Sequence, residues 1–153
     1  YCYCYCYGAR ALTLLHSSVC LTRSHLVPRK VTSQMAYVDG FLIPLPKKNL
    51  AAYKKMARFG AKLWMEHGAL SYVETISDDV KAGKVTSFPQ SVKLKADEVV
   101  VFSWITHISR NERSRILKAV MSDPRMKKWM DPKAMPFDGK RLVYGGFKTF
   151  VEK

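Results

Sequence analysis

The amino-acid sequence predicts an α+β domain of ferredoxin-like type, in which an antiparallel sheet carries both helices on one face. Four strand signals and two helix signals follow each other in the order β-α-β-β-α-β, with an optional extra hairpin between the second and third strands. Val99 to His107 is almost entirely β-branched or aromatic, which predicts a central strand buried on both faces. From Lys48 to His67, apolar residues recur at helical spacing.

Proline and glycine delimit the first elements. Tyr37 to Pro44 is β-prone and should end there, because Pro44 and Pro46 cannot donate to a sheet ladder. The first helix should end at His67-Gly68, since glycine adopts the left-handed conformation that closes many helices. Leu70 to Ile76 follows as the second strand. Its alternation places four side chains on one face: Leu70, Tyr72, Glu74 and Ile76.

The segment Lys84 to Ala96 is ambiguous. Val85 to Phe88 and Ser91 to Leu94 are each compatible with an edge strand, whereas Pro89 argues against a central one. Beyond the third strand, Ser109 and Glu112 fit a capping box that begins the second long helix.

Asp-Pro and Asp-Gly pairs punctuate the end of the chain. Asp123-Pro124 should stop the second helix and cap a short one. Asp131-Pro132 is a second Asp-Pro pair of the same kind. Asp138-Gly139 predicts a turn before the last strand, Arg141 to Phe150. Gly145-Gly146 in that strand indicates a bulge or a close backbone approach.

Residues 1–34 differ in composition from the rest of the chain. They hold all four cysteines and four basic residues, with no Asp or Glu. We favour translated upstream sequence or an incomplete reading frame over a transit peptide, and either over a folded segment. We therefore expect a disordered leader over 1–34 and a single domain over 35–153. The Tyr-Cys alternation matches no zinc-site spacing.

Composition excludes several classes of protein. The chain has 153 residues, a formal net charge of +14 and 48% apolar residues, which is too apolar for a disordered protein. In the later chain the longest apolar run, Val99 to Phe102, is far shorter than the roughly 18 residues of a membrane span. We expect no membrane association and a cytoplasmic location, or an organellar one if the leader is a transit peptide.

Three stretches resemble a known family. They are Tyr37 to Phe41, Val100 to Ile105, and Met121 to Met126 followed by Met135 to Phe147. Together they are similar to the YbaA-like family of small bacterial proteins, a domain of unknown function (DUF1428), from about Met35 to Phe147. The resemblance implies the dimeric α/β-barrel superfamily, in which two ferredoxin-like subunits pack sheet to sheet, and it implies no activity.

The residues themselves also favour a homodimer. A four-stranded sheet covered by helices on one side leaves its other face open to water or to a partner. The apolar strand residues favour a partner, most simply a second copy related by two-fold symmetry.

The sequence leaves open whether the protein is an enzyme. It contains no G-x-S-x-G, no phosphate-binding glycine loop and no H-E-x-x-H. No cofactor or metal is predicted. We rank first a homodimer that binds a small organic molecule between sheet and helices, as superfamily analogues such as cofactor-free monooxygenases and haem-binding enzymes do. The candidate pocket residues are Asp39, Glu74, Trp104, His107, Tyr144 and Arg141.

Each of these candidates also has a structural interpretation, which we favour. Asp39 or Glu74 would form an ion pair with Arg141 or Lys140 that fixes strand register. His107 would be a solvated residue at a strand end rather than an acid or base. Trp104 and Tyr144 would be core residues rather than ligand-stacking ones.

The remaining hypotheses are a non-catalytic structural or stress-associated dimer, ranked second, and an RNA or polyanion binder, ranked third. The basic residues crowd two helix faces, but the strands lack the aromatic signature of an RNA-recognition sheet, so solvated helix faces are favoured. The candidate polyanion-binding residues are Lys54, Lys55, Arg58, Lys62, Arg113 and Lys118.

Overall fold

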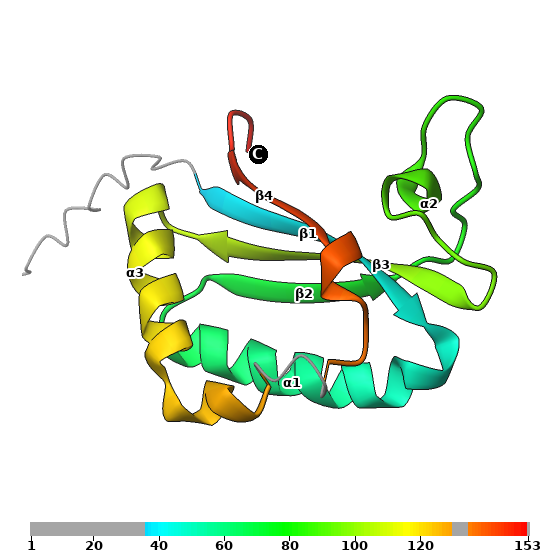
Figure 1. Cartoon of the computed structure of the whole chain (residues 1–153). Coiled ribbons are helices and arrows are strands. Elements are labelled where there is room, and N and C mark those ends of the chain that lie inside the picture. The colour runs from blue at the N-terminus through cyan, green and yellow to red at the C-terminus, as the bar shows by residue number, and fades with distance from the viewer. Residues whose placement is uncertain (1–35, 130–134, 153) are drawn as a thin grey trace, which may run out of the picture. The chain divides into compact units, whose positions relative to one another are not determined.

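The computed structural model describes residues 36–129 and 135–152. A four-stranded antiparallel sheet in the order β2-β3-β1-β4 forms its centre (Figure 1). The predicted α+β class is confirmed. The strands are β1 (Tyr37–Pro46), β2 (Ser71–Ile76), β3 (Glu98–His107) and β4 (Val143–Lys148). The helices are α1 (Leu50–Glu66), α2 (Phe88–Ser91) and α3 (Arg110–Ser122), with 3-10 turns η1 (Lys47–Asn49), η2 (Pro124–Lys128) and η3 (Gly139–Arg141). The expected leader and the Asp131-Pro132 pair lie outside the described residues.

The pairing of β1 with β3 forms the middle of the sheet. It runs from Tyr37 opposite His107 to Pro46 opposite Glu98. The central position predicted for β3 is confirmed, but its expected burial on both faces is confirmed only in part: on the face away from the long helices Val100 is 2% exposed, but Phe102 is not buried. Val101 is 2% exposed, whereas Phe102, on the other face, is 42% exposed. The reason is that the long helices cover only one face.

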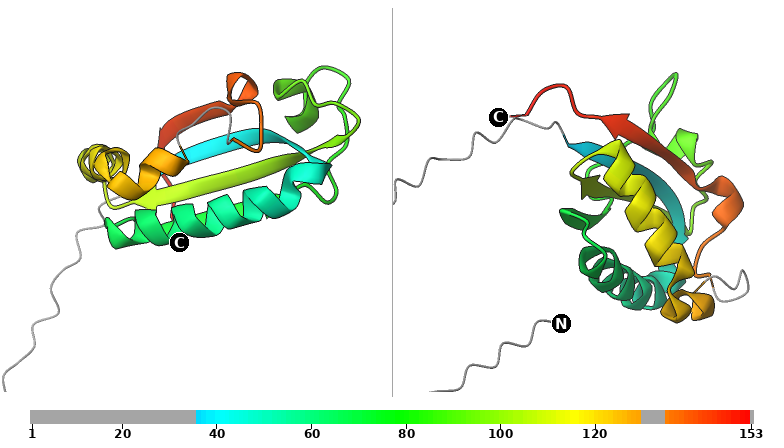
Figure 2. Two further views of the ribbon diagram at one scale, coloured as in Figure 1. Left: turned by 60° about the horizontal axis from the view of Figure 1, so that its bottom comes forward. Right: turned by 90° about the vertical axis from the view of Figure 1, so that its left-hand side faces the viewer.

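Both long helices pack on the face that carries Val101. Ile43, Leu45 and Val101 form one core cluster with Tyr53 of α1. Leu63 of α1 forms a second cluster with Ile116 and Val120 of α3, which joins the two helices. The helix α1 runs along the sheet, and α3 stands at the end where β1 begins and β3 ends (Figures 1 and 2).

Polar caps begin three of the elements, and one glycine ends another, at positions that the sequence predicts. The Ser109 hydroxyl accepts a hydrogen bond from the Glu112 backbone N–H at 3.2 Å and caps α3. Asp123 and Asp138 cap η2 and η3 by accepting from the N–H groups two residues ahead, at 2.9 Å and 3.0 Å. Gly68, with φ of 107°, follows α1 in the left-handed region. None of the helices in the described ranges is long and apolar enough to span a bilayer.

Two local predictions need correction, and one open question is resolved. β1 does not end at Pro44 but continues to Pro46, because the chain stays paired with β3 as far as Glu98. Residues 84–96 form no strand. They contain α2, because Ser87 caps its N-terminus and Pro89 fits its first turn. The last strand is shorter than Arg141–Phe150, since η3 occupies its expected start. Gly146 marks a close approach rather than a bulge, because a Cβ there would lie 2.8 Å from two ring carbons of Tyr37 in an uninterrupted register.

Candidate functional site

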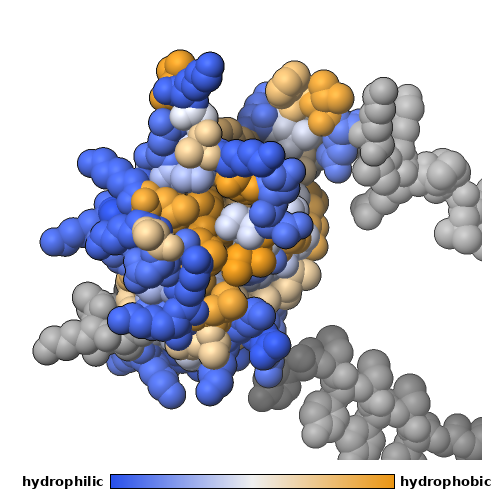
Figure 3. Space-filling view, turned by 90° about the vertical axis from the view of Figure 1, so that its right-hand side faces the viewer, coloured by the Kyte–Doolittle hydropathy of each residue, from blue (hydrophilic) through white to orange (hydrophobic). Residues whose placement is uncertain are grey.

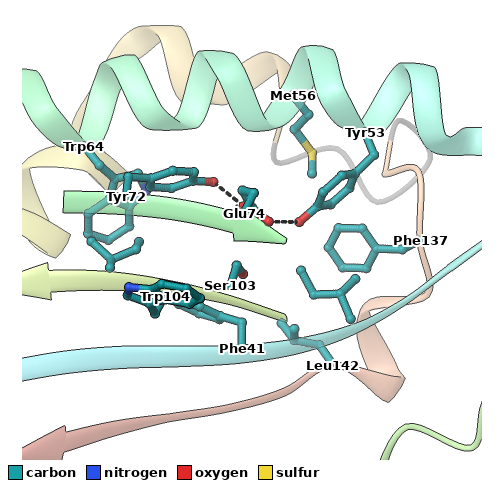
Figure 4. A pocket seen from close by; sticks show the side chains of 12 residues that line it. Phe41, Tyr53, Met56, Trp64, Tyr72, Glu74, Ser103, Trp104, Phe137 and Leu142 are labelled. Carbon is teal, nitrogen blue, oxygen red and sulfur yellow. Dashed lines mark hydrogen bonds between the residues drawn. The ribbon is translucent and has the colours of Figure 1, made fainter. Parts of the chain in front are cut away.

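A hollow of about 200 Å³ lies between α1, the sheet and the segment that precedes β4 (Figure 4). Most of its wall is apolar and comes from Phe41, Ile43, Met56, Phe137 and Leu142. The Asn49 side chain donates to the Pro136 carbonyl at 2.7 Å, which ties the segment before β4 to the start of α1. The hollow is therefore closed on one side by residues far apart in the sequence.

Glu74 is the acidic residue of this hollow, and two tyrosines hold its carboxylate. The Tyr53 hydroxyl donates to Oε2 at 2.7 Å, and the Tyr72 hydroxyl donates to Oε1 at 2.8 Å (Figure 4). Burial raises the pKa of both tyrosines above its ordinary value, and the adjacent Glu74 carboxylate adds to the effect. Both phenols therefore remain protonated donors at neutral pH.

The local sequence explains how these groups meet. Tyr72 and Glu74 are two residues apart on β2, so both point toward α1. Tyr53 comes from the buried side of α1. Gly60 makes room, because a Cβ at that position would lie 3.0 Å from the Tyr72 hydroxyl oxygen. The buried Ser103 stands opposite Glu74 in the β2–β3 register.

A second polar cluster joins the sheet to α3. The Arg113 Nε donates to both carboxylate oxygens of Asp39, at 2.8 Å and 3.1 Å, and Asp39 is 3% exposed. The His107 Nε2 lies 3.3 Å from Asp39 Oδ2, but neither ring nitrogen of this fully buried side chain has a hydrogen-bond partner among the described residues. Burial lowers the pKa of His107, and Asp39 opposes that effect only in part. Burial therefore favours the neutral imidazole of His107.

A third pair anchors the wall of the hollow. Arg141 binds Glu98 through two terminal nitrogens, at 2.8 Å and 2.5 Å, and its Nε donates to Asp138 at 3.2 Å. Glu98 is 5% exposed. Because Phe137 and Leu142 flank this anchor, the pair fixes the part of the chain that closes the hollow.

The predicted ion-pair partners of Asp39 and Glu74 are wrong. Arg141 binds Glu98, which lies opposite Pro46, at the far end of β1 from Asp39. The residue close to Asp39 is Arg113, because α3 begins directly after β3 ends beside the start of β1. Glu74 accepts from tyrosines instead of pairing with a cation.

The structure separates the six predicted pocket residues. Glu74 and Trp104 border the hollow, although the register places the Trp104 ring on the opposite face, where it lies 5.3 Å from the Phe102 ring. Asp39 and His107 belong to the Arg113 cluster, so His107 is buried rather than solvated. Tyr144 is 69% exposed and stacks on Phe41 instead of packing in the core. The sequence analysis did not identify Tyr53, Tyr72 and Ser103 as site residues. The alternation that places Tyr72 and Glu74 on one face of β2 was the signal that could have identified Tyr72.

The six predicted polyanion-binding residues also differ in their surroundings. Lys54, Lys55, Arg58 and Lys62 are exposed on α1, and Lys118 is exposed on α3. Arg113 was predicted to be a polyanion-binding residue, but its guanidinium is bound to Asp39. Among the residues described, His, Cys, Asp and Glu form no group of three or more that could hold a metal ion.

Comparison with known proteins gives a family match and uncharacterised relatives. The model of the family described as "Protein of unknown function (DUF1428)" matches residues 36–139. The "Uncharacterized protein YbaA" of Escherichia coli strain K12 is 46% identical over 119 residues, which is 78% of this chain and 100% of that protein. YbaA of Shigella flexneri gives the same values. The de novo designed protein Foldit4 gives a structural match with a TM-score of 0.37 and 13% sequence identity, which covers 76% of this chain and 99% of that protein.

We expect Asp39→Asn to lower the free energy of unfolding by about 3 kcal/mol, because it removes the counter-charge of a partly buried guanidinium. Urea unfolding measures the loss. Glu112→Gln is the matched control, since it makes the same change in the exposed pair with Arg115 and should cost less than about 1 kcal/mol. Equal losses in the two variants would show that the Asp39 pair contributes no more than a surface pair.

The Glu98–Arg141 pair predicts a loss of stability in acid. The hydrogen bonds from Arg141 lower the pKa of Glu98 from 4.5 to about 2. Because the folded pKa lies below the unfolded one, the stabilisation is complete above pH 4.5 and disappears as the pH falls toward 2. The stability difference between the natural protein and Glu98→Gln should therefore shrink by about 3 kcal/mol between pH 7 and pH 2. A difference that stays constant over this range would contradict the assignment.

Proposed function

The chain belongs to the DUF1428 family of proteins of unknown function, and we propose that it is a homodimer that binds a small organic molecule in the hollow around Glu74. The observation that carries this proposal is a half-buried carboxylate in a mainly apolar hollow, with each oxygen held by a tyrosine hydroxyl.

The proposed ligand is small and mainly apolar, and it carries a hydrogen-bond donor. The hollow, at about 200 Å³, is smaller than the roughly 300–1,000 Å³ of typical sites for drug-sized ligands. Each Glu74 oxygen accepts one tyrosine hydroxyl and keeps a further lone pair. A hydroxyl or amino group of the ligand can use that lone pair while its apolar body contacts Phe41, Met56 and Phe137.

The cost of this arrangement supports binding over a purely structural role. A carboxylate beside apolar side chains must be compensated by hydrogen bonds, and apolar residues of similar volume often give equal or greater stability. A core that serves stability alone is better filled without a carboxylate. The two tyrosines hold Glu74 in one orientation before a ligand arrives, which lowers the entropy cost of binding.

We also propose that each subunit is ferredoxin-like and that two subunits pair through their sheets. The strand order β2-β3-β1-β4, with both long helices on one face, supports a ferredoxin-like arrangement. On the opposite face, Phe102, Val143 and Phe147 are 42%, 44% and 62% exposed. Such an apolar patch supports pairing with a second copy, sheet to sheet, as in the dimeric α/β barrels that the family resembles.

Glu74→Gln should weaken binding of any ligand of this hollow by at least about tenfold, because hydrogen bonds to a charged group are the stronger kind. A thermal-shift screen of small hydroxyl- and amino-bearing aromatic and aliphatic compounds identifies the ligand, and calorimetry measures its affinity. Glu152→Gln, the same change on an exposed residue, should bind like the natural protein. Unchanged affinity in Glu74→Gln, or a screen in which no compound binds, would refute the proposal.

Phe102→Asp should convert the dimer to a monomer, because it places a charge in the proposed contact between sheets. Light scattering coupled to size-exclusion chromatography measures the mass, and circular dichroism checks that the sheet persists. Val85→Asp is the control, since Val85 is 92% exposed and lies outside the sheet. A monomeric natural protein, or a Phe102→Asp variant that remains a dimer, would contradict the assembly.

A further inference from the structure

A second hollow, of about 290 Å³, lies at the other side of the Tyr53–Glu74 pair. Its apolar wall comes from Leu50 and Ala57 of the α1 region and from Ile76 and Val101 of the sheet. It opens near the start of α1 and the end of β2. Figure 3 views this end of the molecule and shows hydrophobic surface bordered by strongly hydrophilic side chains.

Two cations border this hollow. Lys54 and Arg58 both line it, and their spacing of four residues places them on one side of α1. Both are exposed, and neither forms an ion pair with an acid in the described part of the chain. The acid that lines the hollow is Glu74, whose two oxygens accept the tyrosine hydroxyls. The hollow therefore combines an apolar wall with two cations whose charge is not neutralised.

We propose that this second hollow binds a small amphipathic carboxylate, with its apolar body against Ile76 and Val101 and its anionic group between Lys54 and Arg58. A guanidinium can bind a carboxylate through two parallel hydrogen bonds, and an ammonium adds a compact charge. The negative Glu74 on the same wall favours this orientation, because it repels an anionic group placed deeper. Ile76 is 46% exposed, so the apolar body would cover surface that now faces water.

The combination favours a small carboxylate over a polyanion. A nucleic-acid backbone would use the whole basic side of α1, including Lys55 and Lys62, and would gain nothing from an apolar wall. Among the basic residues of α1, only Lys54 and Arg58 line the hollow. The Lys62 Nζ atom instead lies 3.9 Å from the Glu66 Oε1 atom. The site takes a ligand of different charge from the one proposed above, and it lies on the other side of Tyr53 and Glu74, which line both hollows.

The test is a titration of the full chain with hexanoate, followed through the methyl NMR signals of Ile76 and Val101. Lys54→Gln/Arg58→Gln should weaken binding about tenfold, because it removes both charge-assisted partners. Lys55→Gln/Lys62→Gln is the matched control, since it removes two charges from the same helix away from the hollow, and it should change affinity less than about twofold. All four substitutions are at exposed positions, and circular dichroism confirms that the variants fold.

The neutral analogue 1-hexanol should bind at least about tenfold more weakly than hexanoate. Equal binding of the two compounds, equal weakening by the two double variants, or the absence of methyl shifts would overturn the proposal. Equal weakening would indicate a diffuse basic surface of the polyanion-binding kind. Lys54→Gln/Arg58→Gln leaves every residue of the first hollow in place, and Glu74→Gln leaves both cations in place, so the proposals for the two hollows can fail independently.

Discussion

A carboxylate removed from water must be given hydrogen-bonding or charged partners, and this constraint organises the fold. Three acids of the sheet, Asp39, Glu74 and Glu98, are wholly or partly buried. Each receives its partner from a different distant element: Arg113 from α3, Tyr53 from α1, and Arg141 from η3. The three contacts therefore tie both long helices and the approach to β4 onto one sheet.

The three contacts differ in chemistry, and that difference distinguishes Glu74, the central residue of the proposed site, from the other two acids. Asp39 and Glu98 are neutralised by guanidinium groups, and they line neither of the two hollows. Glu74 has only neutral hydroxyl partners, so its charge remains available, and it borders hollows on both sides. A ligand that donates a hydrogen bond and a ligand that carries a negative charge would thus meet different sides of the same Tyr53–Glu74 pair.

The sequence predicted the elements better than the contacts between them. Strand alternation, the Ser109 cap and Gly68 are local signals, and the elements they predict are present in the structure. The partner of Asp39 was mispredicted because strand periodicity says nothing about where a helix begins in space. Tyr53 was missed for the same reason. Its helical spacing marks it as a core residue, and only the packing of α1 on β2 shows that its hydroxyl meets Glu74. The structure of residues 84–96 stayed open in the sequence because Pro89 suits a helix start as well as a strand edge.

The most direct test is a crystal structure of the protein purified from the cells that express it, without an unfolding step. We expect a dimer paired through the exposed sheet face, with electron density for a small molecule in the first hollow and a donor atom within hydrogen-bonding distance of a Glu74 oxygen. A structure in which Phe41, Met56 and Phe137 close over Glu74 and leave no space would contradict the proposed binding site.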